Sequence, residues 1–494
     1  MAIVVHYTAI SSNSIPNEFI CFRPSFFILI ASACCGGSSL SESNAINSGF
    51  KSTITQRGVN HIRDILVAEI RSKISKIKLP NQEGKEHHIK YSVKDIVLGN
   101  LQFGGVNLAR DGSGFRLTIS NIGFDLHCKW HMRYHVVSDS GKVDLHIRNT
   151  KIAISLEVKA TGDGKPAAKS HNPGISIGHL DVKFHGGVTS KFINLFKKTI
   201  AHKIKGTAES AVRTQMGAVL NQAIKKSLSS VQTIFPVDQY SDFDLRLMNI
   251  AYADNFFISP AFNGNFLPHG SKTRPPLPTN AIPSHINDRH IQIFLSEYMF
   301  NSGSYVYFHK GLLQQTITDK DIPQQSWIHL NTKSFKFIIP EMYAKYPDMP
   351  MQATIAAKNF PKLSLNNTNI KFNIPVVANL SVVTPKGLVK DLVSVAINVE
   401  SVAEVHLSGM RIHGKVNLVG FKFNVIKSEF VKIDGQQLSK VINDLCKYGI
   451  VPFFNPALEK GLEIPITKGV TVKNPTLSFG KGFVAVTSDI DYTF

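Results

Sequence analysis

Five basic side chains recur at every second position of one short stretch of the chain. They are His127, Lys129, His131, Arg133 and His135. The stretch is FDLHCKWHMRYHV, residues 124–136, and its other positions are mostly apolar. Because alternate residues of a β-strand point to opposite faces of a sheet, we predict one long strand with a basic face and an apolar face.

The histidines of this face could bind a metal ion or contribute to a cationic surface. His127, His131 and His135 would be spaced about 13 Å apart along a strand, which is too far for one ion to be held from a single strand. We therefore predict no metal site, and no motif for any other cofactor is found. The functional interpretation is a surface that gains charge as the pH falls towards about 6, and an ordinary solvated face is the alternative.

The charge of the chain is strongly and unevenly positive. The 494 residues carry a net charge of +20, and residues 51–240 hold 29 Lys and Arg against 14 Asp and Glu. With 43% hydrophobic and 18% charged residues, the composition is that of a globular protein. Such a charge favours polyanionic partners: nucleic acid, an anionic membrane surface or an acidic glycolipid.

The N-terminal region predicts export. Arg23 precedes an apolar run, residues 26–33, that ends in the cleavage signature Ala31-Ser32-Ala33. The run is too short to span a bilayer, and no other stretch reaches the roughly 18 uninterrupted apolar residues that a membrane helix needs. A disordered leader is the alternative. We predict a secreted, extracellular protein.

Two cysteines and two glycosylation sequons lie in the body of the chain. Cys128 is on the apolar face of the predicted strand, so we expect a buried free thiol, and Cys446 lies in the other half. The sequons at Asn366 and Asn379 are candidate glycosylation sites and agree with export.

Apolar periodicity predicts the same order of elements twice. A helix at 59–78, strands over 90–186 and a long helical run at 189–230 precede a proline-rich linker at 264–285. Strands over 291–337 and 350–432, a helical segment at 340–346, a helix at 435–447 and terminal strands then follow. Long strands beside long amphipathic helices can enclose an elongated apolar slot, which suits acyl chains, although an ordinary core gives the same pattern.

Enzymatic signatures are missing from the sequence. It contains no G-x-S-x-G, no P-loop, no G-x-G-x-x-G after a strand and no H-E-x-x-H. A lipase-like enzyme would need an activated nucleophile, and none is found. A nucleic-acid binder could use the charge but would need neither an export signal nor apolar slots. We predict a protein that is not an enzyme and does not bind nucleic acid.

Several ordered segments resemble the family of bactericidal/permeability-increasing and lipopolysaccharide-binding proteins, which includes the plasma lipid transfer proteins. The most specific is LSEYMFNSGSYVYFHKGLLQQTITDKDIP, residues 295–323, after the linker. ITQRGVNHIRDILVAEI, SKIKLP, NLFKKTIAHKI, FIIPEMYAKYPDMPMQATIAA and IVPFFNPALEKGLEIP resemble further family segments in order. The resemblance covers about Thr53 to Phe494.

The resemblance implies an α+β fold shaped as an elongated, two-barrel boomerang. Each barrel would pair a curved antiparallel sheet with long amphipathic helices, and a central sheet would join them. The expected parts are a leader with a signal peptide at 1–48, an N-terminal lipid-binding barrel at 49–240, a central sheet and Pro-rich linker at 241–290 and a C-terminal lipid-binding barrel at 291–494.

The resemblance also implies two kinds of site. A basic tip on the first barrel would bind anionic headgroups or lipopolysaccharide through Lys85, Lys90, Lys94, Lys129, Arg133 and His131, with His87, His88 and His135 as auxiliaries. An apolar pocket would accept acyl chains, with Ile62, Leu66, Ile70, Trp130, Phe196 and Ile200 as its expected lining.

Two departures from the family pattern affect these expectations. The tip has fewer lysines than in the endotoxin binders and substitutes histidine, which weakens the case for tight lipid A binding at neutral pH. The usual disulfide between a strand and the second long helix is missing, because KPAAKSHNPGIS and AVRTQMGAVL contain no cysteine. Such a loss removes about 2–4 kcal/mol of constraint.

The leading hypothesis is a secreted lipid-binding protein of innate defence. Its expected partners are phospholipid, lipopolysaccharide or the bacterial outer membrane, and anionic membrane surfaces. The alternative is a phospholipid transfer or carrier protein without endotoxin specificity. The basic first half favours the former, and the low lysine content of the tip favours the latter.

Overall fold

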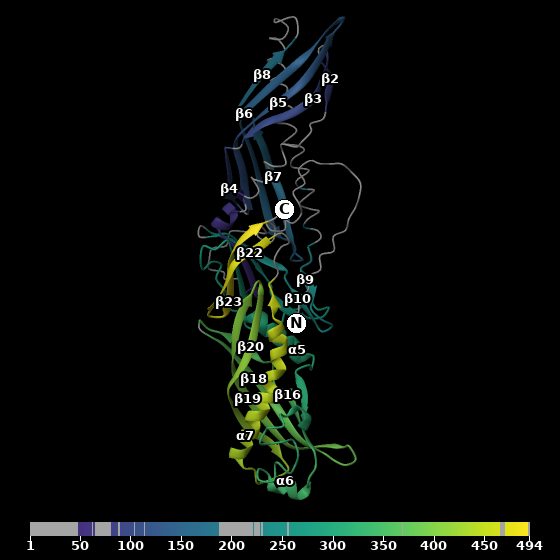
Figure 1. Ribbon diagram of the computed structural model, residues 1–494, viewed down its shortest axis with the longest axis vertical. Helices are drawn as coiled ribbons and strands as arrows, with labels where there is room; N and C mark the ends of the chain where they lie inside the picture. The colour runs from purple at the N-terminus through teal and green to yellow at the C-terminus, as the bar shows by residue number, and fades with distance from the viewer. Residues whose placement is uncertain are drawn as a thin grey trace.

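The protein is an elongated molecule built largely from long antiparallel strands (Figure 1). The computed structural model describes residues 48–61, 63–64, 81–86, 89–102, 104–112, 114–186, 221, 228, 231–253, 256–367, 369–464 and 470–492. In Figure 1, a sheet of N-terminal strands extends to one end of the molecule and helix α6 lies at the opposite end. A further sheet lies between them, as expected for the two-barrel α+β architecture.

The N-terminal sheet contains seven strands in the order β2-β3-β5-β6-β7, with β4 paired to β5 and β8 paired to β6. Their bounds are β2 Gln82–Glu86, β3 Ile89–Gln102, β4 Gly105–Asp111, β5 Gly114–Tyr134, β6 Val137–Ala160, β7 Pro166–Ser176 and β8 His179–His185. Strand β5 includes most of the predicted alternating stretch and has 21 residues, so it spans about 70 Å.

Irregular positions along these long strands curve the sheet. The pairing of β3 with β5 shifts register between Lys94 and Val97 and between Gly99 and Gln102. Asp95 and Asn100, at these two shifts, have positive φ angles of 55° and 49°. Asp and Asn adopt this left-handed conformation more readily than most residues, and bulges increase local bending and twist.

The central sheet joins strands from both halves of the chain in the order β11-β12-β1-β14-β23-β22. Their bounds are β1 Phe50–Ile54, β11 Leu247–Ala253, β12 Phe256–Phe262, β14 Ile291–Ser296, β22 Val470–Gly480 and β23 Phe483–Tyr492. A small neighbouring sheet has the order β13-β10-β9, with β9 Ile234–Pro236, β10 Ser241–Asp244 and β13 Asn265–Pro268.

The C-terminal sheet has the order β15-β16-β18-β19-β20-β21, with β17 paired to β18. Its strands are β15 Gln314–Thr318, β16 Met351–Ala357, β17 Lys362–Leu365, β18 Ile370–Val383, β19 Val389–Ser408, β20 Arg411–Ser428 and β21 Leu462–Glu463. The helices of this half are α5 Glu297–His309, the 3₁₀ turn η2 Asp319–Asp321, α6 Pro340–Lys345, α7 Gly435–Leu445, the π-helical turn η3 Cys446–Ile450 and α8 Val451–Lys460.

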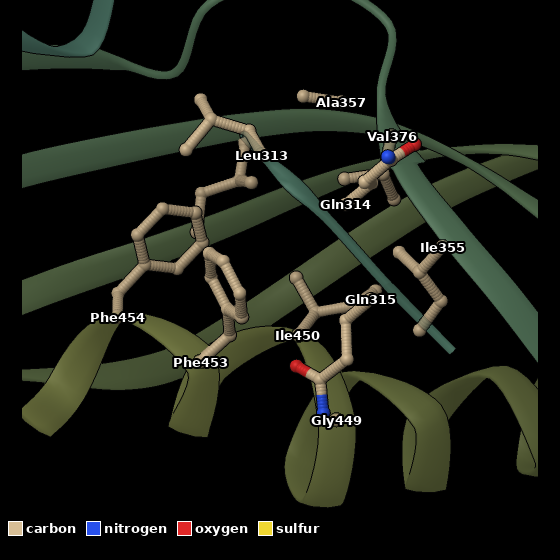
Figure 2. Close-up of a pocket in the computed structure, with 11 residues that line it drawn as sticks. Leu313, Gln314, Gln315, Ile355, Ala357, Val376, Gly449, Ile450, Phe453 and Phe454 are labelled. Atoms are coloured by element: carbon tan, nitrogen blue, oxygen red, sulfur yellow. The ribbon is translucent and has the colours of Figure 1, made fainter. Parts of the chain in front are cut away.

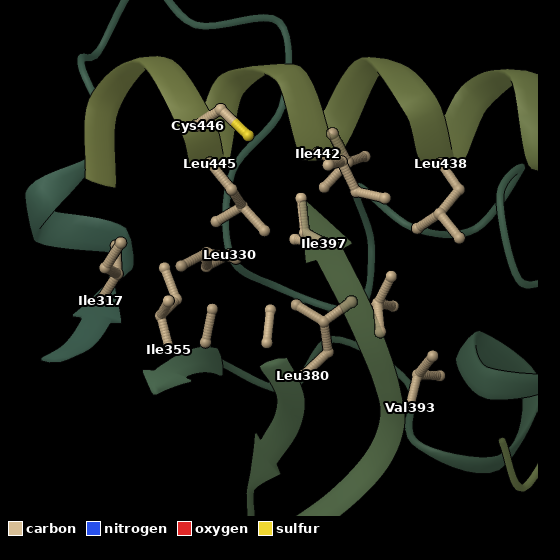
Figure 3. Packing of buried hydrophobic residues seen from close by; sticks show 14 of the residues in the cluster. Ile317, Leu330, Ile355, Leu380, Val393, Ile397, Leu438, Ile442, Leu445 and Cys446 are labelled. Carbon is tan, nitrogen blue, oxygen red and sulfur yellow. The ribbon is translucent and has the colours of Figure 1, made fainter. Parts of the chain in front are cut away.

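The largest described core lies where α7 covers the C-terminal sheet (Figure 3). Leu438, Ile442 and Leu445 project from one face of α7 towards strand residues such as Leu380 and Ile397. Asp434 caps the helix by accepting hydrogen bonds from the N–H groups of Gln436 and Gln437. This amphipathic helix was predicted from its apolar period, and burial of that face positions the rest of the barrel.

One predicted strand region is wrong. Residues 297–309, within the expected strands at 291–337, form helix α5. Its buried residues, including Tyr298, Ser302 and Val306, recur at helical spacing, and Gly303 allows close approach to the ring of Phe266. Packing of these residues on β13 favours the helix over the predicted strand.

The long helices predicted at 59–78 and 189–230 lie largely outside the described residues. Residues 56–61, 63, 64, 221 and 228 are helical.

The Pro-rich segment after β13 packs against the central sheet. The Lys51 ammonium donates to the carbonyl of Ile282 at 2.7 Å, and the Thr53 hydroxyl donates to the carbonyl of Ser284 at 2.6 Å. Burial lowers the pKa of Lys51 to about 8. Ile282 itself is buried against Phe294. These contacts fix the segment along β1 and β14.

An asparagine links strand β7 to the region of the second predicted helix. The Asn221 Oδ1 accepts hydrogen bonds from the Ser170 N–H at 2.7 Å and from the Ser170 hydroxyl at 2.9 Å. Ser170 is buried. Ser170 lies in the cysteine-free segment KPAAKSHNPGIS, and Asn221 directly follows the cysteine-free segment AVRTQMGAVL. This contact, called the polar clamp, therefore connects the two regions that the expected disulfide would have joined.

We expect Asn221→Ala to lower the free energy of unfolding by about 1–3 kcal/mol, because the buried Ser170 N–H and hydroxyl would lose their shared acceptor. Chemical denaturation measures this change. Asn107→Ala, at an exposed position of β4, is the control and should stay within about 0.5 kcal/mol of the parent protein. Equal stability of the two variants would contradict a structural role for the clamp.

Candidate functional site

The register of the N-terminal sheet places six cations in two rows on one face. Lys85 pairs with Lys90, which pairs with Arg133, and these three form the outer row, next to the β5–β6 turn. Lys94 pairs with Lys129, which pairs with Lys142, and these three form the inner row. Side chains directly opposite each other on neighbouring strands lie about 5 Å apart at Cβ, so each row concentrates like charge.

The inner row is largely neutralised within the protein. The Lys94 ammonium lies 3.1 Å from the Glu83 carboxylate, and the Lys129 ammonium lies 2.8 Å from the Asp95 carboxylate. The hydrogen bond and charge of Asp95 raise the pKa of Lys129, and those of Lys129 lower the pKa of Asp95. Two of the predicted phosphate contacts therefore already have carboxylate partners.

The outer row keeps its charge available. Within the part of the chain that the structure describes, no carboxylate lies within salt-bridge distance of Lys85, Lys90 or Arg133. Arg133 donates from Nε to the carbonyl of His135 at 3.2 Å, which leaves its terminal nitrogens available. His131 is exposed between the two rows. His87 and His88 lie outside the described residues.

The predicted strand ends two residues earlier than its alternation suggests. Strand β5 ends at Tyr134, and His135, with a φ of 50°, and Val136 form the turn into β6. Val136 is therefore 92% exposed, and Tyr134 and Val137 are exposed beside it. Tyr134 and Val136, which the alternation assigns to the apolar face of the strand, are therefore not buried as Trp130 is. They form an apolar projection beside the outer row. In the sequence, this projection is indicated by the adjacent valines 136 and 137, which break the alternation of apolar and polar residues.

Trp130 occupies the inner face of β5. Its indole N–H donates to the Lys142 carbonyl at 3.1 Å, and its ring meets Phe184 edge to face with centroids 5.5 Å apart. At 5% exposed it belongs to a core that also contains Cys128.

Cys128 and Cys446 are free and buried, and burial raises their pKa values to about 11 and about 12. The other expected lining residues, Ile62, Leu66, Ile70, Phe196 and Ile200, lie outside the described residues.

A buried carboxylate anchors the far end of the basic face. Burial would raise the pKa of Asp125, but hydrogen bonds from Asn100, His146 and Arg148, at 2.5, 2.8 and 2.7 Å, outweigh burial and hold the pKa well below its usual range. The folded-state pKa thus lies below the unfolded value of about 3.9. The resulting stability is present above about pH 4 and is lost as the pH falls through the folded-state pKa.

We expect Asp125→Asn to lower the free energy of unfolding at pH 7 by about 1–3 kcal/mol and to flatten its decline below pH 4, since the titrating group is gone. Urea denaturation at a series of pH values measures both effects. Asp64→Asn removes an exposed carboxylate that pairs with Arg63 at 2.8 Å, and it should change neither. An unaltered acid profile in Asp125→Asn would exclude this carboxylate as a source of the pH dependence.

The C-terminal half contains an apolar hollow between the sheet and the helices that follow α7 (Figure 2). Its empty volume is about 320 Å³ and opens to solvent. The lining residues are Leu313, Gln314, Gln315, Ile355, Ala357, Ile374, Val376, Gly449, Ile450, Phe453 and Phe454. Gly449 lets the π-helical turn approach the strands, because a Cβ there would collide with the Ile317 side chain.

The hollow combines apolar walls with few polar groups. Phe453 and Phe454 project from α8 on one side, and Ile355 and Val376 lie on strands on the other. Gln314 and Gln315, neighbours on β15, are the polar residues of the lining. The sequence reasoning did not identify this site, since its lining comes from segments more than 100 residues apart.

The two candidate glycosylation residues differ in their surroundings. Asn366 is exposed in the turn between β17 and β18, and its N–H donates to the carbonyl of Asn369. Asn379 is half-buried within β18, between Thr354 of β16 and Ser394 of β19. Asn366 is therefore the more accessible acceptor.

Neither a metal-ligand cluster nor a membrane-spanning helix is found in the described part of the chain. Among its residues, no group of three or more His, Cys, Asp or Glu side chains could hold a metal ion. None of its helices is long and apolar enough to cross a membrane.

Comparison with known proteins identifies the class to which this architecture belongs. Models of the N-terminal and C-terminal domains of the LBP / BPI / CETP family match residues 58–230 and 236–492. The chain is 27% identical to a bactericidal permeability-increasing protein of Sebastes schlegelii over 466 residues, covering 91% of this chain and 96% of that protein. It is 23% identical to a lipopolysaccharide-binding protein of Mus musculus, covering 92% and 96%.

A crystal structure of lipopolysaccharide-binding protein has the same fold, with a TM-score of 0.59 at 21% identity, covering 91% of this chain and 100% of that chain. This chain therefore belongs to the LBP / BPI / CETP family, which confirms the resemblance and the predicted fold class. Members of the family bind or transfer lipids and are not enzymes.

Proposed function

We propose that the protein is secreted and binds anionic lipid headgroups, lipopolysaccharide in particular, with the basic face of its N-terminal sheet. The observation that carries this proposal is the outer row, in which Lys85, Lys90 and Arg133 stand side by side with no described carboxylate partner. Three adjacent cations of this kind suit closely spaced phosphates, and Arg can contact a phosphate with two N–H groups.

The proposed binding is non-covalent and uses both parts of an amphiphile. Phosphates contact the outer row and the exposed His131 beside it. The exposed Tyr134, Val136 and Val137 enter the lipid layer beside them. Acyl chains enter apolar interiors such as the C-terminal hollow. This chemistry suits a protein of innate defence. Its expected partners are bacterial outer membranes and anionic membrane surfaces, and binding to nucleic acid is not expected.

A second candidate function is phospholipid carriage without endotoxin specificity. It is favoured by the pairing of Lys94 with Glu83 and of Lys129 with Asp95, which leaves four of the six cations of the two rows without a described carboxylate partner. The apolar hollow in the C-terminal half suits a neutral phospholipid equally well. The two functions differ in the charge of the preferred headgroup.

Equilibrium binding to lipopolysaccharide and to neutral phosphatidylcholine vesicles, in parallel at about 150 mM salt and pH 7.4, distinguishes the two functions. The proposal expects tight binding to lipopolysaccharide that weakens as salt is added, with little affinity for the vesicles. Equal or preferential uptake of phosphatidylcholine would overturn it and favour carriage.

A further inference from the structure

Helix α6 lies at the end of the molecule opposite the N-terminal sheet (Figure 1). This end carries a second group of exposed apolar side chains. Three segments meet there: the 333–346 region with α6, the β18–β19 turn and residues 426–434. Glu429 joins them, since its carboxylate lies 3.4 Å from Lys345 of α6 and 3.1 Å from Lys390 of β19. Hydrogen bonds from the Val431 N–H to Glu341 and from the Asp434 N–H to the Ile338 carbonyl complete the contact.

Each segment exposes apolar side chains next to buried ones. Phe337 is 82% exposed although Phe335 is fully buried, and Val431 is 92% exposed although Phe430 is buried. The same end also exposes Leu388, Val389 and Ile426. Because their neighbours are packed in the core, these side chains project from an ordered surface. Phe337, Leu388, Val389, Ile426 and Val431 are called the distal apolar tip.

Lysines surround the distal apolar tip. Lys333, Lys336, Lys386, Lys427 and Lys432 are exposed, and within the described residues none of them pairs with a carboxylate. The Lys336 ammonium lies 6.0 Å from the ring centre of Phe337 and 5.5 Å from that of Tyr343. The five unpaired ammonium groups are available to phosphates.

The carboxylates of this end are engaged by the protein itself. Glu429 pairs with two lysines, Glu341 accepts the Val431 N–H, and Asp434 caps α7. Asp348 accepts the Tyr343 hydroxyl, and Asp391 accepts the Ser381 hydroxyl. In a lipid bilayer, acyl chains lie beneath a layer of headgroup phosphates. Exposed apolar side chains with unpaired lysines around them match this arrangement when the phosphates are anionic.

We propose that the distal apolar tip docks on a bilayer that contains anionic phospholipid. Phe337 and Val431 enter the acyl-chain boundary, and the surrounding lysines contact headgroup phosphates. This surface uses none of the residues of the N-terminal basic face or of the C-terminal hollow, so it is a membrane contact in addition to the proposed function.

The first test places a fluorescent reporter at the tip of the full-length protein. Phe337→Trp is combined with Trp327→Phe, which leaves the buried Trp130 as the second tryptophan. The probe is a phosphatidylcholine vesicle with about 30% phosphatidylserine and bromine-labelled acyl chains. We expect the emission of the introduced tryptophan to shift to shorter wavelength and to be quenched. Sedimentation of the protein with the vesicles without either change would overturn the proposal while leaving N-terminal binding intact.

The second test measures affinity for the same vesicles without bromine. Because the N-terminal face is expected to bind them too, Lys85→Ala, Lys90→Ala and Arg133→Ala are present in every variant. We expect Phe337→Ser with Val431→Ser to weaken the remaining binding about tenfold or more. Val419→Ser is the control. It removes an apolar side chain that is 63% exposed on β20, outside the distal apolar tip, and should leave binding unchanged.

Two other outcomes would overturn the proposal. Equal losses in the tip variant and in Val419→Ser would indicate a nonspecific effect of exposed apolar surface. Unchanged vesicle binding, together with a dimer that the tip variant abolishes in analytical ultracentrifugation, would assign the tip to a second copy of the chain.

Discussion

Replacing Lys85, Lys90 and Arg133 together by alanine is expected to weaken binding to lipopolysaccharide about 150-fold at physiological salt. A lysine or arginine near an anionic surface contributes about 1 kcal/mol, and loss of three such contacts, about 3 kcal/mol, corresponds to that factor in Kd. These residues form one row across β2, β3 and β5, and no described carboxylate offsets them. Equilibrium titration of the purified protein against lipopolysaccharide measures the change.

The inner row supplies a matched control for this triple variant. Glu83→Gln with Lys94→Gln removes one charge of each sign from β2 and β3, two of the three strands that carry the outer row, and breaks a 3.1 Å pair. Because that pair is neutral as a whole, we expect a change in Kd of less than about threefold. The salt dependence should also become shallower in the triple variant but not in the control. A loss of similar size in both would show that strand geometry, not the unpaired charge of the outer row, determines affinity.

We expect Ala357→Phe to prevent lipid from binding in the C-terminal hollow. Ala357 lines the hollow at the end of β16, so a phenyl ring there would occupy space otherwise open to an acyl chain. If about four methylenes are displaced at about 0.8 kcal/mol each, the affinity of the site should fall roughly 200-fold. Native mass spectrometry of the protein after incubation with phosphatidylcholine would record the lost lipid adduct.

The neighbouring residue provides the control for the cavity variant. Ala356 follows Ile355 on β16 and faces the opposite side of the sheet, since side chains alternate. Ala356→Phe adds the same ring outside the hollow and should retain the adduct. Thermal unfolding of both variants shows whether the fold is kept, because overpacking typically costs about 1–3 kcal/mol. Full lipid occupancy in a folded Ala357→Phe protein would exclude the hollow as the binding site.

Period-two alternation was sufficient to predict the long strand β5 and its basic face, because side-chain direction in a strand depends only on the parity of the position. It could not predict the turn at His135 and Val136. A two-residue turn usually contains Gly or Asn, and a histidine with positive φ gives no such signal. Tyr134 and Val136 were therefore assigned to the apolar face of one continuous strand.

The charge state of the basic face depends on contacts that alternation does not encode. Pairing of Lys129 with Asp95 requires the bulge between Lys94 and Val97, which turns Asp95 towards the outer face. Pairing of Lys94 with Glu83 requires the register of β2 against β3. Net charge correctly indicated a basic N-terminal half, but which lysines are available to a ligand is a property of register. The C-terminal hollow depends likewise on packing between α8 and distant strands.

The central sheet has a consequence for how the chain is made. Strand β14 lies between β1 on one side and β23 on the other. Roughly 190 residues separate the end of β14 from the start of β23, so at about 5–20 residues per second a ribosome needs about 10–40 s to supply that second neighbour. During this interval the nascent chain exposes an unpaired edge that can recruit other strands. Chaperone protection of β14 during synthesis is therefore a requirement that this topology imposes.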